Sequence, residues 1–204
     1  MKIKISSWKK EIWEHRHLIL LSFGFLLISL LINYFSGMYV SNVPGVVAPD
    51  LILDHLPTID LDFLFLYGSL LLLAIFFIYP LLFRVRDLHK VISQFSLIVF
   101  VRSIFMSFTH LALPLTSYTF SLPYIFSFFI FQNDLFFSGH TALPFLGFLL
   151  FKNKKIKYFF LASSIIMAAT VLLMHVHYTI DVFSAYFITY GTFKIGERFF
   201  SKID

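Results

Sequence analysis

Two short polar stretches stand out in an otherwise apolar chain, because their side chains have the types needed for chemistry. They are residues 134–141, with the sequence DLFFSGHT, and residues 175–181, with the sequence HVHYTID. Each stretch holds ionisable and hydroxyl groups beside a long apolar run. Such groups are costly to hold at a bilayer unless they face one another in a shared polar site. We therefore expect the two stretches to meet.

His177 and Asp181 have a spacing that favours a working pair. They are four residues apart at the start of an apolar run, which would place them on one face of a helix. A carboxylate there can orient the imidazole and fix its tautomer. Since an Asp buried without a partner tends to take up a proton, the position of Asp181 is better explained if it holds His177 ready as a nucleophile or base.

Ser138, Gly139 and His140 form a small-residue turn that enters another apolar run. Free backbone amides and a hydroxyl at such a turn can bind a phosphate. Arg102 lies near the middle of a third run, where a guanidinium needs a counter-charge and its planar donors fit a phosphate. A purely structural alternative pairs Arg102 with an Asp such as Asp181.

Together these residues predict a phosphoryl-transfer site that needs no metal and no cofactor. One His would attack phosphorus and become a phosphohistidine, while the other would protonate the departing oxygen. Arg102 and the donors around Ser138 would meet the charge on the equatorial oxygens.

Two other interpretations of the same cluster stay open. An intramembrane zinc hydrolase would use H-x-H and carboxylate ligands, which here are His140, His175, His177 and Asp134. Alternatively, the polar cluster would be the non-catalytic core of a transporter or of an assembly subunit.

The composition is that of a membrane protein. Of the 204 residues, 59% are apolar, 20% are aromatic and only 13% are charged, and several apolar runs approach the roughly 20 residues needed to cross a bilayer. The chain has no Cys, which excludes disulfides and thiolate chemistry. The net charge of +5 does not indicate nucleic-acid binding, because the basic residues sort by loop.

We predict an all-α integral membrane protein with six transmembrane helices in one bundle, over residues 18–200. Residues 1–17 would form a basic amphipathic segment at the membrane interface. The first span is expected to be uncleaved, since no small-residue cleavage pattern is clear around residues 36–38. The predicted spans are residues 18–35, 61–83, 91–113, 136–151, 158–174 and 178–193.

The basic residues predict the orientation of these spans. With both termini cytoplasmic, fifteen of the sixteen Lys and Arg residues fall in cytoplasmic tails or turns, and the exception is Arg102; short cytoplasmic loops collect such residues. This topology puts both motifs near the outer ends of their spans. Residues 118–131 are rich in Phe and Tyr and are broken by Pro123, which favours an interfacial or re-entrant helix able to guide a lipid sideways into the site.

The two motifs resemble those of the sphingomyelin synthase family, a branch of the type 2 phosphatidic acid phosphatase superfamily. The similar segments are Ser138-Gly139-His140-Thr141 and His177-Tyr178-Thr179-Ile180-Asp181-Val182. Asp134, six residues before His140, is similar to the Asp of the family motif C-G-D-x-x-x-S-G-H-T, and residues 185–189 continue the likeness. Looser similarities involve Arg102 with Thr109 and Leu113-Pro114, and Leu56-Pro57 to Asp60.

The resemblance implies that His177 is the nucleophile, Asp181 its partner and His140 the general acid. The family fold, six membrane helices with an exoplasmic site, agrees with the predicted topology. The residues expected to contact phosphate or substrate are Arg102, Asp134, Ser138, Gly139 and Tyr178. The superfamily's usual Ser-Arg pair before its last His has no counterpart, since Val171-Leu172 occupy about that place, which favours the synthase-like branch.

We therefore expect a membrane enzyme that moves a phospho-alcohol headgroup, such as phosphocholine or phosphoethanolamine, between lipids. The donor would be a glycerophospholipid and the acceptor a ceramide or diacylglycerol, in the bacterial cytoplasmic membrane with the site facing the exoplasmic side. The closest alternative is a lipid phosphatase or phospholipase C-like hydrolase with the same site, in which water takes the phosphoryl group. Gln132-Asn133 stand where the family has C-G, which leaves the headgroup and the acceptor open.

Overall fold

The described part of the chain is built from helices and irregular loops. The computed structural model describes residues 5–118, 131 and 133–200, and over these residues it has no strand beyond an isolated bridge between Val46 and Leu111. The α-helices are α1 (Ile5–Glu14), α2 (Arg16–Asn42), α3 (Ser69–Phe83), α4 (Leu88–Phe108), α5 (Gly139–Leu150), α6 (Lys154–Leu173) and α7 (Thr179–Phe200). Three short helical turns are η1 (Leu53–His55), η2 (Leu64–Gly68) and η3 (Val85–Asp87).

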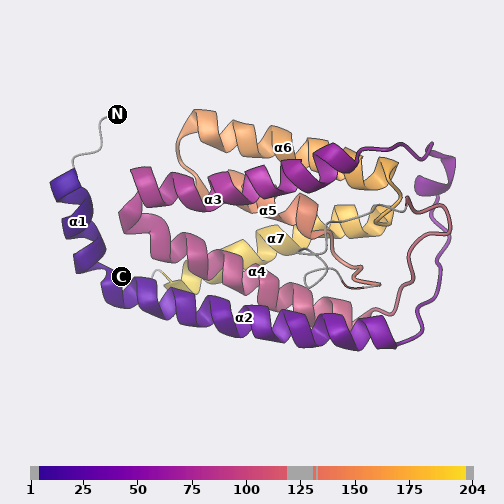
Figure 1. The fold of residues 1–204 in the computed structure, drawn as a ribbon, viewed down its shortest axis with the longest axis horizontal. Coiled ribbons are helices and arrows are strands. Elements are labelled where there is room, and N and C mark those ends of the chain that lie inside the picture. Colours follow the sequence, from indigo (N-terminus) through magenta and orange to yellow (C-terminus); the bar gives the residue numbers. More distant parts are fainter. Residues whose placement is uncertain (1–4, 119–130, 132, 201–204) are drawn as a thin grey trace.

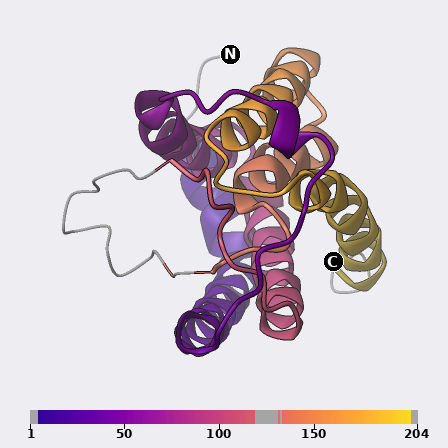
Figure 2. The ribbon, with the colours of Figure 1, turned by 90° about the vertical axis from the view of Figure 1, so that its right-hand side faces the viewer.

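Helices α2 to α7 run along the long axis of one bundle, and α1 lies across one end (Figure 1). Helix α2 packs mainly against α4, whereas α5 packs against α6 and α7. The loops 43–63, 109–118, 133–138 and 174–178 gather at the end opposite α1, which faces the viewer in Figure 2. We call this end, with those loops, the loop end.

Among the residues that the structure describes, four helical segments are long and apolar enough to cross a membrane: Arg16–Asn42, Leu64–Phe83, Val85–Phe108 and Lys154–Leu173. Helix α5 is apolar but has only 12 residues. These features indicate a multi-pass membrane protein. The predicted count of six spans and the orientation of the termini remain predictions.

Several helix boundaries differ from the predicted runs. Helix α2 begins two residues before the predicted span 18–35 and extends seven residues beyond it, to Asn42. Helix α4 ends at Phe108, because Thr109 adopts an extended conformation with φ −119° and ψ 106°, so residues 109–113 are not helical. Helix α5 begins at Gly139 rather than near Phe136. The interfacial helix predicted for residues 118–131 falls almost entirely outside the described residues.

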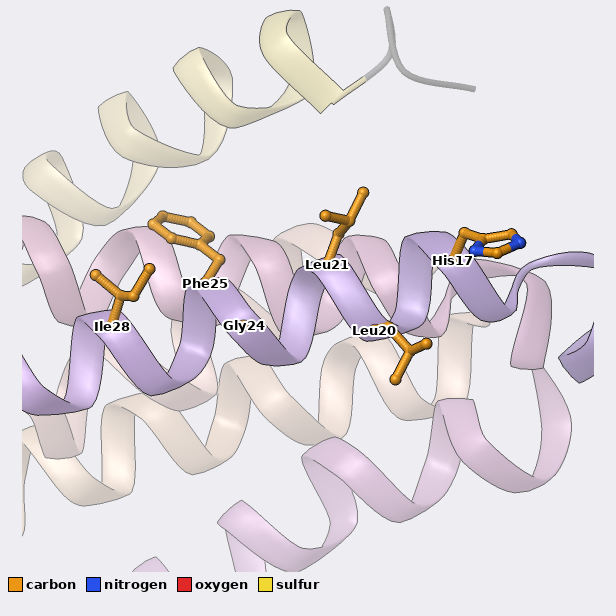
Figure 3. Close-up of a pocket in the computed structure, with 6 residues that line it drawn as sticks. All are labelled: His17, Leu20, Leu21, Gly24, Phe25 and Ile28. Carbon is orange, nitrogen blue, oxygen red and sulfur yellow. The ribbon is translucent and has the colours of Figure 1, made fainter.

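Much of α2 presents apolar side chains outward. Leu20, Leu21 and Ile28 are each more than half exposed. Figure 3 shows these residues along the helix, together with His17 and Phe25. Because exposed apolar surface of this extent is typical of lipid or protein contact, this surface suits acyl chains.

The ends of the bundle differ in charge. The α1 end carries the turns 84–87 and 151–153 and the C-terminal end of α7, and therefore most of the described Lys and Arg residues. The loop end carries instead a series of acidic residues: Asp50, Asp54, Asp60, Asp62, Asp134 and Asp181. Both polar motifs therefore lie away from the basic end.

Aromatic packing fixes α5 against α6. Phe76, Phe160 and Leu146 are fully buried in the main apolar cluster. Gly147 allows the close approach, since a Cβ there would lie 2.6 Å from Cδ1 of Phe160. This contact positions α5, whose other end carries His140.

Candidate functional site

The first motif forms the N-terminal cap of α5. Ser138 is extended, with φ −62° and ψ 113°, and its Oγ accepts a hydrogen bond of 3.4 Å from the backbone N–H of Thr141. A serine at this position satisfies a helix donor that would otherwise lack a partner. The cap places His140 in the first turn of the helix, at the loop end of the bundle.

The second motif forms the start of α7. Asp181 lies in the first turn of this helix and is fully buried, and its Oδ2 accepts from the backbone N–H of Tyr178 at 3.0 Å. The same oxygen lies 3.1 Å from Nδ1 of His177. His177 thus precedes the helix, and the pair is made by a carboxylate reaching back at the helix start, as in a capping box, rather than along a helical face.

The structure brings together the two imidazoles, one from the first turn of α5 and one from the loop just before α7. The ring centroids of His140 and His177 are 6.3 Å apart with an interplanar angle of 59°. Asp181 occupies Nδ1 of His177, which leaves Nε2 as the nitrogen available to a ligand. On the other side, the ring of His140 stacks on Phe65 at 4.3 Å, so an aromatic side chain limits its motion.

Arg102 is bound to the loop that precedes α5. Its Nη2 lies 2.8 Å from Oδ1 of Asp134, and its Nη1 donates to Oδ2 at 3.2 Å. Its Nε donates at 3.0 Å to the carbonyl of Phe137, the residue before the Ser138 cap. The acidic partner of Arg102 is therefore Asp134 and not Asp181, and a phosphate would have to share or replace these contacts.

Gly139 and Tyr178, the other residues expected to contact phosphate or substrate, both lie at the loop end. A Cβ on Gly139 would lie 3.5 Å from Nε of Arg102, an ordinary contact distance. The hydroxyl of Tyr178 donates to the carbonyl of Ala112 at 2.9 Å and accepts from the backbone N–H of Ala48 at 3.1 Å. Because both contacts are with loop backbone, this hydroxyl ties α7 to the loops at the loop end.

Asp50 belongs to this region and was not found by sequence reasoning. It is 8% exposed, and its carboxylate accepts from the backbone N–H of Thr179 at 2.6 Å and from the Thr179 hydroxyl at 2.7 Å. Burial alone would raise the pKa of this carboxyl, but hydrogen bonds from Leu53, Thr179 and Ile52 hold the pKa below its ordinary value of 3.8. Asp50 and Thr179 are 129 residues apart, so no short sequence spacing predicts their contact. Only the position of Asp50 in an acidic loop could have suggested a role for this residue.

The ligands required by the zinc alternative have different partners. His175 is buried and its Nδ1 contacts the hydroxyl of Thr116, whereas Asp134 is paired with Arg102. Over the part of the chain that the structure describes, no group of three or more His, Asp or Glu side chains is arranged to hold a metal ion. The geometry therefore does not favour the zinc alternative.

Comparison with protein families gives a match over the C-terminal part of the chain. A family model described as PAP2 superfamily C-terminal matches residues 133–198, a segment that contains both polar motifs. The match supports placing the chain in the type 2 phosphatidic acid phosphatase superfamily and suggests a lipid phosphatase or phosphotransferase. No curated protein and no solved structure matches the chain. The narrower resemblance to the sphingomyelin synthase family remains a prediction.

Proposed function

We propose that this protein is a membrane phosphotransferase of the sphingomyelin synthase type, which moves a phospho-alcohol headgroup from a glycerophospholipid to a ceramide or diacylglycerol. The observation that carries the proposal is the pair of imidazoles, 6.3 Å apart at the ring centroids, one of which is held by a buried carboxylate. A single tetrahedral phosphorus group can contact two rings placed in this way.

In the first half-reaction, Nε2 of His177 attacks phosphorus and forms an N–P bond, while the P–O bond to the donor's diacylglycerol breaks. Protonated His140 gives its proton to the departing oxygen, which leaves as a hydroxyl. Asp181 keeps Nδ1 of His177 hydrogen-bonded, so that Nε2 carries the lone pair and the imidazolium formed on phosphorylation is stabilised.

The second half-reaction reverses these roles. Neutral His140 takes the proton from the acceptor hydroxyl, whose oxygen attacks phosphorus as the N–P bond to His177 breaks. Backbone donors at the start of α5 and the guanidinium of Arg102 would meet charge on the phosphoryl oxygens. Ping-pong kinetics follow from the covalent intermediate.

The intermediate can be tested directly. Purified protein incubated with headgroup-labelled phospholipid is expected to acquire acid-labile label, and the label should be absent from His177→Ala. His55→Ala is a matched control, because His55 is an exposed residue of the same end whose Nδ1 contacts the carbonyl of Leu51. A normal turnover rate in His177→Ala would reject the assigned role.

A hydrolase using the same residues is the second candidate, favoured by the superfamily-level match. In that reaction water replaces the acceptor lipid in the second half-reaction. Supplying ceramide or diacylglycerol separates the candidates: a new phospholipid supports transfer, whereas release of headgroup phosphate alone supports hydrolysis. The proposed location is the bacterial cytoplasmic membrane with the site on the exoplasmic side, which agrees with the separation of the motifs from the basic end of the bundle.

A further inference from the structure

The N-terminus of α7 is held by a carboxylate from a distant loop. Asp50 accepts hydrogen bonds from the backbone N–H and the hydroxyl of Thr179, the first residue of α7. The same carboxylate also accepts from the backbone N–H groups of Ile52 and Leu53, at 3.1 Å and 3.0 Å. Asp50 therefore joins its own loop to the helix start in one set of contacts.

The negative charge of the Asp50 side chain also suits the N-terminus of α7. The first turn of a helix has free N–H donors and a partial positive charge, which a carboxylate stabilises. Asp181 satisfies the donor of Tyr178, and Asp50 satisfies that of Thr179. The two carboxylates thus divide between them consecutive backbone donors directly after His177.

The loop that carries Asp50 is itself anchored. The backbone N–H of Val46 donates to the carbonyl of His110 at 2.9 Å, and that of Ala112 donates to the carbonyl of Val46 at 3.0 Å. The Tyr178 hydroxyl bridges the backbone of Ala48 and Ala112. Residues 178 and 179 are therefore fixed to two loops, 43–63 and 109–118, and these contacts begin one residue after His177.

We propose that Asp50 is a positioning residue that holds the backbone of His177 at the distance from His140 that phosphoryl transfer requires. Asp181 sets the orientation of the His177 ring, whereas Asp50 sets where that ring stands relative to α5. This inference rests on the proposed function for its kinetic consequences, but the placement it describes can be measured without turnover.

The kinetic test uses the full chain with Asp50→Asn, which keeps the size of the side chain and removes its charge. The rate of label transfer to His177 is expected to fall by about tenfold to a hundredfold, because small misplacements of reacting groups cost that much, with the KM for the donor lipid unchanged. Thr179→Val should lower this rate as well. Thr179→Ser, which keeps the hydroxyl that contacts Asp50, should have the wild-type rate. The matched control is Glu197→Gln, since Glu197 is an exposed carboxylate near the other end of α7, where it pairs with Lys194.

The placement test uses the absence of Cys from the chain. A His140→Cys/His177→Cys variant should be cross-linked rapidly by a short bifunctional thiol reagent. Adding Asp50→Asn should slow the reaction by about tenfold or more, whereas adding Glu197→Gln should not. If the double-Cys protein cross-links at the same rate with and without Asp50→Asn, the positioning role of Asp50 is overturned. An Asp50→Asn enzyme that transfers label at the wild-type rate would also overturn it. If the wild type forms no phosphohistidine while cross-linking still depends on Asp50, the proposed function fails and the placement by Asp50 stands.

Discussion

The backbone N–H of Ser138 donates a hydrogen bond of 3.1 Å to the carbonyl oxygen of Asp181. This bond joins the cap of α5 to the first turn of α7, so the two polar motifs are in direct contact through their backbones. Because the bond is made by backbone atoms, it contributes to how close the backbones of His140 and His177 lie, independently of the Asp181 side chain. The charge of Asp181 can therefore be changed separately from the backbone link.

Asp181→Asn is the first variant in which this separation can be tested. The amide keeps the shape of the side chain, but it cannot hold the tautomer of His177 or stabilise a positive imidazolium, so we expect kcat to fall by about 10²–10⁴-fold. Steady-state kinetics on purified protein will measure the change. Glu197→Gln, which alters an exposed carboxylate paired with Lys194, should leave kcat unchanged. An Asp181→Asn enzyme with wild-type kcat would contradict the role of this carboxylate.

The ion pair of Arg102 and Asp134 predicts a different pattern. Asp134→Asn removes the counter-charge of a guanidinium that is 13% exposed, so we expect both activity and thermal stability to fall, the latter by about 2 kcal/mol. The double variant Arg102→Met/Asp134→Asn removes the uncompensated charge and should recover part of the stability but none of the activity. A double-mutant cycle on thermal unfolding will measure the coupling.

If Asp134→Asn alone proves as stable as the wild type, the pair does not fix the loop before α5. A normal activity in the double variant would show that neither side chain is needed for the reaction. The two readouts therefore separate the structural contribution of Arg102 from its proposed contact with phosphate.

How much of the site the sequence predicts depends on the separation of the residues along the chain. The pairing of His177 with Asp181 follows from a spacing of four residues, although it is formed by a reach back at a helix start rather than along a helical face. The partner of Arg102 does not follow from spacing, because Asp134 lies 32 residues away in an irregular loop. Such contacts depend on how the bundle closes, which apolar periodicity does not specify.

The same limit applies to the fold. Apolar runs give the approximate places of the helices, because burial in lipid requires them. Their ends are set by local features such as the Ser138 cap and the extended residue Thr109, which compete with hydropathy over a few residues. Sequence reasoning missed Asp50 for the same reason that it missed the pairing of Arg102 with Asp134. The hydrogen bonds from Thr179 to Asp50 also join distant parts of the chain.

Gly147 allows a test of the packing that positions α5. A Cβ at this position would lie 2.6 Å from the ring of Phe160, so Gly147→Ala should cost about 1–3 kcal/mol of stability through overpacking. Gly191→Ala, in α7, is the matched control, because no atom outside the helix backbone lies within 4 Å of the added Cβ; it should be neutral or stabilising by up to about 1 kcal/mol. Thermal unfolding in a fixed detergent will measure both, and adding Phe160→Leu should recover part of the loss. Equal stability of the two Ala variants would show that α5 and α6 can separate without cost.

The carboxyl of Asp50 predicts how one part of the stability depends on pH. Its pKa in the folded protein lies below the ordinary value of 3.8, because backbone and Thr179 donors favour the charged form over the opposing effect of burial. A group whose pKa is lowered on folding stabilises the folded state above its unfolded pKa, and this contribution is lost as the pH falls through the folded pKa. The wild type should therefore be more stable than Asp50→Asn by a constant amount from neutral pH down to about pH 5, and the difference should shrink below about pH 4. Chemical unfolding of both proteins across this pH range will measure the difference in their stabilities. Taking the difference removes the effect of the other carboxylates, which both proteins share. A difference that stays constant or grows below about pH 4 would mean that the charge of Asp50 does not hold the start of α7.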